Sequence, residues 1–351
     1  MTRLETQVLQ VFLMVIIVLH NTSNNLLGAW PLSEFYFQDH YLFLFANHFS
    51  NITWKIIPLI IISLGYTAVA SFLILTGYGL YKRYEHEPLI FIPYFKRRLT
   101  YLFIPWLITS LWIELVLLHS PSLLHWVLMF STLQLWIPHH QPLLLGPWWF
   151  IAMIFELYLI FPVILSSYKK YGFKLILFLI LTQYLIQVFI NPWTNSWGLN
   201  LNLTPISALL PISIGLCLAH KNYDFKNQKF SWLVLLILGI LFFIAQINFY
   251  TWPFANTLFG LVLLGLGLKL LKFKKIKHSR FMGHLCHLIV PVFLVHGYLY
   301  VFFMPWLESS QITFLDYLII LISMLGLTYL CALLVNKIST EFKKNLKNLK
   351  I

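Results

Sequence analysis

The stretch 56-IIPLIIISLGYTAVASFLILTGYGL-80 contains no charged residue over 25 positions, and after Tyr81 it is followed by Lys82 and Arg83. A helix needs about 20 mostly apolar residues to cross the hydrocarbon core of a bilayer. The stretch is therefore long enough to span a membrane. The two basic residues mark its cytoplasmic end, because Lys and Arg collect on that side of membrane proteins.

The rest of the chain has a similar composition. Of its 351 residues, 60% are hydrophobic and only 10% are charged, whereas a soluble domain carries roughly 25% charged residues. A soluble protein of this composition would expose apolar surface throughout, so we expect lipid around most of the chain. The formal net charge of +13 lies in short clusters between apolar runs. This is how membrane proteins mark their cytoplasmic side, so we expect no nucleic-acid partner.

Ten apolar runs indicate an all-α protein, a polytopic transmembrane helical bundle of about ten spans in a single domain over residues 1–351. We expect these spans near residues 5–24, 56–80, 99–118, 148–167, 173–191, 203–220, 231–250, 254–271, 284–306 and 312–336.

The distribution of basic residues predicts the orientation of these spans. With a cytoplasmic N-terminus, 23 of the 24 Lys and Arg residues fall on the cytoplasmic side, and only Lys55 falls outside. If the shorter run Leu123–Ile137 also crossed, every later basic cluster would lie on the outer face, against the positive-inside rule. We therefore predict an outer-face loop at 119–147, re-entrant or interfacial. The basic segment 337–351 is then a cytoplasmic tail, and both chain ends are cytoplasmic.

Several ionisable residues lie within or near the ends of apolar runs, and three of them stand out. Glu156 lies in 147-PWWFIAMIFELYLIFP-162, His296 lies in 291-PVFLVHGYL-299, and His20 lies near the outer end of the first run. Ionisable groups are costly in a bilayer and are candidates for a functional site. A structural hydrogen bond to a neighbouring helix is the alternative for each of them.

The segment 96-KRRLTYLFIPW-106 has an unusually dense basic cluster for a short loop. Lys96, Arg97 and Arg98 either set topology or hold the phosphates of a nucleotide-like donor, since Arg binds phosphate through two parallel hydrogen bonds. The outer loops are rich in Trp and His and form either an interfacial belt or a sugar-binding lip. The three cysteines have no zinc-ligand spacing, and we expect no metal site.

Four stretches, in this order, resemble segments of acyltransferase family 3, whose members are integral membrane proteins. They are 72-FLILTGYGLYKR-83, 96-KRRLTYLFIPW-106, 147-PWWFIAMIFELYLIFP-162 and 291-PVFLVHGYL-299. The resemblance implies transfer of an acyl group, commonly acetyl from acetyl-CoA, to a sugar hydroxyl of an envelope polysaccharide, lipopolysaccharide or peptidoglycan. It also implies a bacterial inner-membrane location, acyl-CoA as a donor substrate rather than a permanently bound cofactor, and a glycan or lipid-linked sugar as acceptor.

The first span departs from the family pattern of a basic residue, ten residues and then a histidine. Eleven residues before His20 stands Leu9, and a shift of one residue gives the pair Gln10 and Asn21. Either His20 works with a different partner, or the chemistry of this chain is altered or lost.

The mechanism that we expect from the resemblance assigns three roles. The catalytic residues are His20 as base, Glu156 to orient the base or the acceptor, and His296 as a reserve base. The phosphates of the donor would contact Arg97, Arg98 and Lys96. The acceptor sugar would contact Asn21, Trp149 and Tyr158.

Two other classes of protein fit the same composition. A polysaccharide transporter or polymerase would also be basic, aromatic-rich and polytopic, although the outer loops here carry one Lys and no Arg. A non-catalytic acyltransferase-like subunit is the other alternative, because neither Leu9 nor Gln10 is a base.

Overall fold

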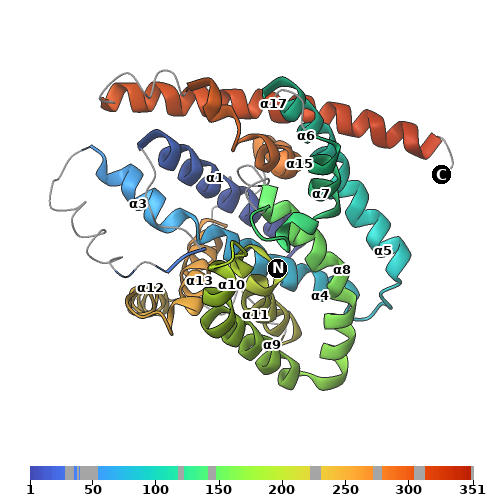
Figure 1. The fold of residues 1–351 in the computed structure, drawn as a ribbon, viewed down its shortest axis with the longest axis vertical. Coiled ribbons are helices and arrows are strands. Elements are labelled where there is room, and N and C mark those ends of the chain that lie inside the picture. The colour runs from blue at the N-terminus through green and yellow to red at the C-terminus, as the bar shows by residue number, and fades with distance from the viewer. Residues whose placement is uncertain are drawn as a thin grey trace. The chain divides into compact units, whose positions relative to one another are not determined.

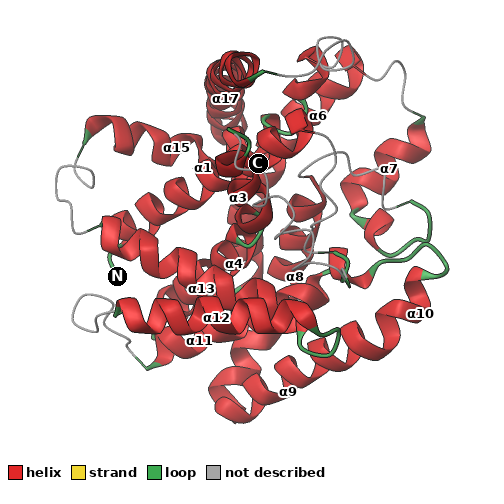
Figure 2. Cartoon of the chain, turned by 90° about the vertical axis from the view of Figure 1, so that its left-hand side faces the viewer, coloured by secondary structure: helices red, strands yellow, loops and turns green. Residues whose placement is uncertain are grey.

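The computed structural model of the protein describes residues 1–27, 35–37, 39, 54–117, 122–140, 148–221, 231–271, 279–303 and 313–348. The regular structure of these residues is entirely helical, which confirms the expected all-α class (Figure 1, Figure 2). The chain forms two compact units. Unit 1 is Met1–Pro88 with Val163–Cys286, and unit 2 is Leu89–Pro162 with His287–Ile351.

Within the described residues, every predicted apolar run overlaps at least one helix. The helices of unit 1 are α1 (Arg3–Leu27), α3 (Ile56–Gly65), α4 (Ala68–Tyr84), α9 (Phe173–Leu185), α10 (Asn191–Asn195), α11 (Leu209–His220), α12 (Trp232–Ile247) and α13 (Trp252–Leu270). The helices of unit 2 are α5 (Phe91–Arg98), α6 (Ile104–Leu117), α7 (Leu123–Ser131) and α17 (Phe314–Asn348). The residue ranges of α8 (Trp148–Tyr171) and α15 (Arg280–Val295) include the division between the units.

Among the described residues, six helical stretches are long and apolar enough to cross a membrane. They are Arg3–Leu27, Ile56–Tyr84, Trp148–Tyr171, Phe173–Asn195, Trp252–Leu270 and Phe314–Asn345. Three more apolar helices are shorter, at Pro205–His220, Trp232–Ile247 and Arg280–Val295. The chain is thus a multi-pass membrane protein by helix length and composition, whereas the count of ten crossings stays a prediction.

Helix α4 packs against α11, α1 and α13 within unit 1. Two glycines let α4 and α11 approach closely, because a Cβ atom on Gly77 would overlap the backbone of Ile212 and one on Gly215 would overlap the backbone of Ile74. Lipid tails are as apolar as Leu, so close backbone packing through small residues is a main source of helix association in a bilayer.

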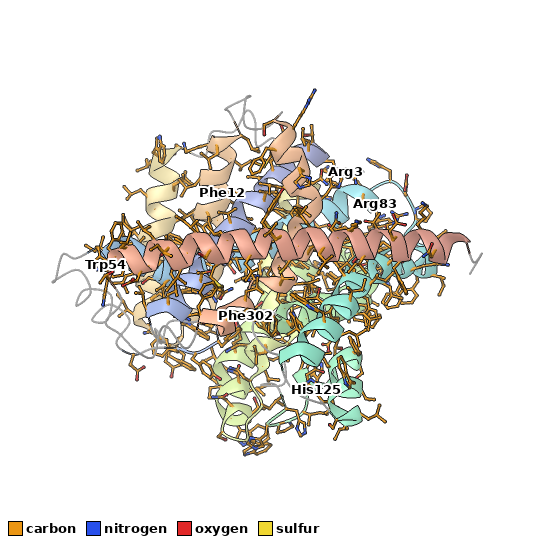
Figure 3. The ribbon with its side chains drawn as sticks, turned by 90° about the horizontal axis from the view of Figure 1, so that it is seen from above. Arg3, Phe12, Trp54, Arg83, His125 and Phe302 are labelled. Atoms are coloured by element: carbon orange, nitrogen blue, oxygen red, sulfur yellow. The ribbon has the colours of Figure 1, made fainter. Side chains whose placement is uncertain are left out.

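The predicted cytoplasmic ends of several helices meet at one end of unit 1. The N-terminal amine donates to the hydroxyl of Tyr78 (3.1 Å), and Lys169 Nζ donates to the carbonyl oxygen of Tyr84 (2.6 Å). Arg3 at the start of α1 and Arg83 at the end of α4 lie at this same end (Figure 3). The beginning of α1 and the ends of α4 and α8 therefore share one end of the unit, and its cytoplasmic position stays a prediction.

Two π-helical segments interrupt the regular helices, η1 at Leu99–Phe103 and η4 at Ile186–Ile190. Each ends two residues before a proline, Pro105 or Pro192. Proline has no N–H to donate to the carbonyl four residues earlier, so the local hydrogen-bond ladder changes register there. The basic cluster at the end of α5 thus leads directly into a π-helical turn.

The segment predicted as an outer-face loop contains the short helix α7. Its nine residues rise about 13 Å, less than half of the roughly 30 Å hydrocarbon core. Ser122 caps its start by accepting the backbone N–H of His125 (3.2 Å), and Thr132 ends it with a left-handed backbone (φ 62°). A helix of this length does not cross a bilayer by itself, and the position of the loop on the outer face stays a prediction.

Candidate active site

His20 lies near the C-terminal end of α1, 17 residues beyond Arg3 and thus about 26 Å along the helix axis. It is only 8% exposed, and its ring centroid lies 6.0 Å from that of Tyr66. A Cβ atom on Gly65 would lie 2.7 Å from the Cβ of His20, so α3 approaches α1 closely here. The Nδ1 atom of His20 is buried and has no hydrogen-bond partner among the described residues.

Tyr66 connects His20 to α12, because its hydroxyl accepts a hydrogen bond from the buried amide of Gln246 (2.8 Å). The rest of this neighbourhood is an apolar cluster that comprises Leu59, Ile62, Phe242, Ala245, Trp252 and Ala255 together with Tyr66. His20 therefore lies beside the hydrogen-bonded pair Tyr66 and Gln246, inside an otherwise apolar part of unit 1.

The position eleven residues before His20 faces the same side of α1, since eleven residues turn a helix through about 1100°. Leu9 at that position is 1% exposed, and its side chain packs on Gly267 of α13. Gln10 and Asn21 are each half-buried. Leu9 packs on a helix backbone at the position where the family pattern has a basic residue.

Glu156 of α8 is bound by the segment that follows α7. Its Oε2 atom accepts a hydrogen bond from the indole Nε1 of Trp136 (2.9 Å), and the carboxylate also accepts from the side chain of Thr132. Both donors belong to described residues 122–140. The carboxylate therefore ties the predicted outer-face loop to α8.

Arg98 lies over the ring of Tyr158, with 4.8 Å from the guanidinium carbon to the ring centroid, and at 5.6 Å over Tyr94. A guanidinium at such distances is attracted to the ring faces. The Nε atom of Arg98 is buried and has no hydrogen-bond partner among the described residues, whereas Lys96 and Arg97 are exposed. Of the three basic residues, Arg98 is the one that the fold turns inward.

One turn of α8 is therefore contacted by two other elements of unit 2, the segment after α7 and the end of α5. Glu156 and Tyr158 are two residues apart, so they are separated by about 3 Å along the axis and about 200° around it. The segment after α7 binds one side of this turn, and Arg98 lies against the other. Of the predicted site residues, Tyr158 and Arg98 are brought together, whereas Glu156 faces the opposite side of the same turn.

His296 is buried and hydrogen-bonds within its own turn, with 2.8 Å from its Nδ1 to the carbonyl oxygen of Phe293. Nδ1 therefore carries the proton, and Nε2 is the basic nitrogen in this tautomer. Trp148 supports the same segment by donating to the carbonyl oxygen of Leu294 (3.1 Å). Trp149, predicted to contact the acceptor, is half-buried. His20 and Asn21 belong to unit 1, and the other predicted site residues belong to unit 2.

Sequence reasoning missed a buried amide network in unit 1. Gln183 donates to Gln187 (3.0 Å), and Gln187 donates to Asn202 (2.9 Å). The carbonyl of Gln183 accepts the backbone N–H of Leu210 at the start of α11 (2.6 Å). The sequence feature that could have revealed this network is the i,i+4 spacing of the two glutamines within an apolar run, because buried amides need hydrogen-bond partners. The network fixes the turns that lead into α11.

A cavity of about 320 Å³ opens at the basic end of unit 1. Its lining residues are Tyr168, Gly172, Phe173, Cys217, His220 and Lys221. Nδ1 of the lining residue His220 lies 2.8 Å from the hydroxyl of Tyr81. Within the described part of the chain, no group of three or more His, Cys, Asp or Glu side chains could hold a metal ion.

A family model described as an acyltransferase domain matches residues 5–334, almost the whole chain. No curated protein and no solved structure matches the chain significantly.

Proposed function

The chain belongs to the acyltransferase family that this domain defines, and from that premise we propose that it is an O-acyltransferase of the bacterial inner membrane. The donor is acyl-CoA, most simply acetyl-CoA, from the cytoplasm. The acceptor is a hydroxyl of an envelope polysaccharide, a lipopolysaccharide or a lipid-linked sugar.

The proposed topology has ten spans with both chain ends in the cytoplasm. It is supported by the joined ends of α1, α4 and α8, which carry Arg3, Arg83 and Lys169. It also places the cavity residue Lys221 at the end of α11 on the same side. This orientation exposes the basic cluster of α5 to cytoplasmic donor and the segment after α7 to outer-face acceptor.

The observation that carries the proposal is the turn of α8 at Glu156 and Tyr158. Arg98 lies over Tyr158, and Trp136 donates to Glu156. In the proposed topology these contacts reach α8 from opposite sides of the membrane and end about 3 Å apart along its axis. A donor held by Arg98 and an acceptor oriented by Glu156 would then lie at the same depth on opposite faces of one turn of α8, and the acyl group would pass around this turn.

The chemistry requires a base for the acceptor hydroxyl. The hydroxyl oxygen attacks the thioester carbonyl carbon while His20 takes the hydroxyl proton. The tetrahedral intermediate then collapses, breaks the carbon–sulfur bond and releases the thiolate of coenzyme A, which takes the proton from His20. Lys96 and Arg97 attract the donor phosphates at the surface, and His296 is the reserve base. Asn21, Trp149 and Tyr158 contact the sugar.

A non-catalytic acyltransferase-like subunit is the second candidate. The burial of Leu9 against Gly267 favours it, because this packing leaves no room for the basic partner that the family carries there. Such a subunit would bind envelope glycan or another membrane protein without transferring an acyl group.

Mass spectrometry of envelope glycans from cells with and without the gene tests the proposal. We expect deletion to remove an acyl ester that wild type restores and that His20→Ala does not restore. The matched control is His86→Ala, which alters an exposed histidine of the same unit and is expected to restore the ester. An ester that persists after deletion would exclude the acyltransferase activity, and altered glycan chain length or export would favour a polymerase or transporter.

A further inference from the structure

The buried polar atoms of unit 2 that have no hydrogen-bond partner in the described residues include three on or beside the helices α5 to α8. They are the indole Nε1 of Trp106, the amide Oε1 of Gln134 and the guanidinium Nε of Arg98. Trp106 and Gln134 are both 0% exposed. In a bilayer no bulk water reaches such groups, so leaving them unpaired is costly. Orphaned donors and acceptors in a native fold point to a ligand or to ordered water.

Trp106 belongs to a cluster of aromatic rings. The ring of Trp106 lies 5.8 Å from Phe103 and 5.6 Å from Phe130, and Phe103 lies 6.1 Å from Phe155 of α8. The Phe155 ring is also 5.5 Å from Phe95, which stands near the C-terminal end of α5.

The other two orphaned groups are tied to this cluster through the chain. The amide nitrogen of Gln134 donates to the carbonyl of Met129 (3.3 Å), the residue before Phe130. Arg98 ends α5 and lies over Tyr158, three residues beyond Phe155 on α8. The part of unit 2 around this cluster thus holds two unpaired N–H donors and one unpaired carbonyl acceptor near apolar rings.

This pattern complements a thin, flexible chain that carries amide groups. Each amide offers a carbonyl oxygen to a donor such as Trp106 Nε1 and an N–H to an acceptor such as Gln134 Oε1. The methylene groups of such a chain suit the aromatic walls, and a phosphate at its end suits Arg98. The pantetheine arm of coenzyme A has these features, with two amides between a phosphate and the thiol.

We infer that the aromatic cluster around Trp106 binds the pantetheine arm of the acyl-CoA donor. The inference rests on the proposed function and adds to it a binding subsite in which Trp106 donates to a pantetheine carbonyl. Trp106 is a binding residue in this scheme, and it takes no part in proton transfer.

The test compares the binding of two probes to purified full-length protein in lipid nanodiscs. CoA carries the pantetheine arm, and adenosine 3′,5′-bisphosphate lacks it. For Trp106→Phe we expect the affinity for CoA to fall about tenfold, the value of one hydrogen bond, while the affinity for the bisphosphate stays unchanged. Trp106 is fully buried, so the smaller side chain should lower the melting temperature, and both affinities are measured at a temperature where the variant is folded.

The control is Trp126→Phe, because Trp126 stacks on the same Phe130 ring at 5.5 Å and is half-buried. It should leave the affinities for both probes unchanged. If Trp106→Phe leaves the CoA affinity unchanged, or lowers both affinities equally, the pantetheine subsite is wrong and a buried water satisfies the indole.

A second measurement uses only wild-type protein, so it stands even where the variant does not fold. An analogue of CoA with its two pantetheine amides replaced by esters should bind about tenfold more weakly, since each ester lacks the N–H that Gln134 accepts. Equal affinity for CoA and the analogue would overturn the subsite alone. Binding of neither CoA nor the bisphosphate would overturn the subsite and also the proposed donor.

Discussion

Replacement of Gly65 by alanine tests whether the position of His20 matters for activity. The new methyl group would lie 2.7 Å from Cβ, 3.3 Å from Cγ and 3.5 Å from Nδ1 of His20. Carbon atoms in contact prefer about 3.5–4.0 Å, so α1 and α3 must separate by about 1 Å or the imidazole must tilt by a similar amount.

The expected effect on activity is larger than the effect on stability. Overpacking of this kind costs about 1–3 kcal/mol, which leaves the protein folded but less stable. A displacement of about 1 Å in a catalytic group lowers the rate by about 100-fold. We therefore expect Gly65→Ala to reduce acyl ester formation by about 100-fold at normal expression.

The assay is the amount of acyl ester per folded protein, with folding checked by size-exclusion chromatography in detergent. Gly79→Ala is the matched control, because this glycine of α4 is exposed and no atom lies within 4 Å of the added methyl. If the Gly65 variant retains activity within about twofold of this control, a difference of only about 0.4 kcal/mol, the placement of His20 by α3 does not govern the reaction.

Three further variants test the fold. Gly77→Val should lower the melting temperature, because its side chain would overlap the backbone of α11 at a cost of about 1–3 kcal/mol or more. Glu156→Leu should speed hydrogen exchange of described residues 122–140, since the indole of Trp136 loses its acceptor, worth about 1–3 kcal/mol. Glu85, outside the spans, has its pKa held below the ordinary value by the hydrogen bond from Lys82. Its stabilisation is therefore full above the unfolded-state pKa and is lost as pH falls through the folded-state pKa, so the melting difference between wild type and Glu85→Gln should vanish in acid.

Each of these variants has an outcome that contradicts its reasoning. An unchanged melting temperature for Gly77→Val would mean that α4 and α11 do not pack as closely as described. Unchanged exchange in the Glu156 variant would mean that this carboxylate does not hold the segment after α7. A melting difference for the Glu85 variant that is the same at neutral and at acid pH would remove the salt bridge as its cause.

The family and the helical segments were readable from the sequence, because both depend on local features. Runs such as 56–80 are long and apolar, and a helix of that length needs no partner to satisfy its backbone in lipid. The break between α3 and α4 at Tyr66 and Thr67 was not foreseen, because the run contains no charged residue on either side of it.

The candidate site was predicted as residue types but not as an arrangement. The sequence placed Lys96, Arg97 and Arg98 in one cluster, and only packing showed that Arg98 turns toward α8 while the other two face outward. The partners of Glu156 were likewise unforeseen, since the hydrogen bond from Trp136 joins residues 20 positions apart. Such contacts depend on how α7 and α8 pack.

The sequence by itself determined that the chain is a membrane-embedded, all-helical acyltransferase-family member, because apolar length, basic clusters and short motifs are properties of the chain alone. The tertiary structure decided which polar groups meet in lipid. Gly65 packs on His20, Gln187 pairs with Asn202, and the indole of Trp106 is left without a protein partner. The physical reason is that helix packing in a bilayer depends on the shapes of the side chains and on the pairing of buried polar atoms. Neither can be predicted from the spacing of residues along the chain.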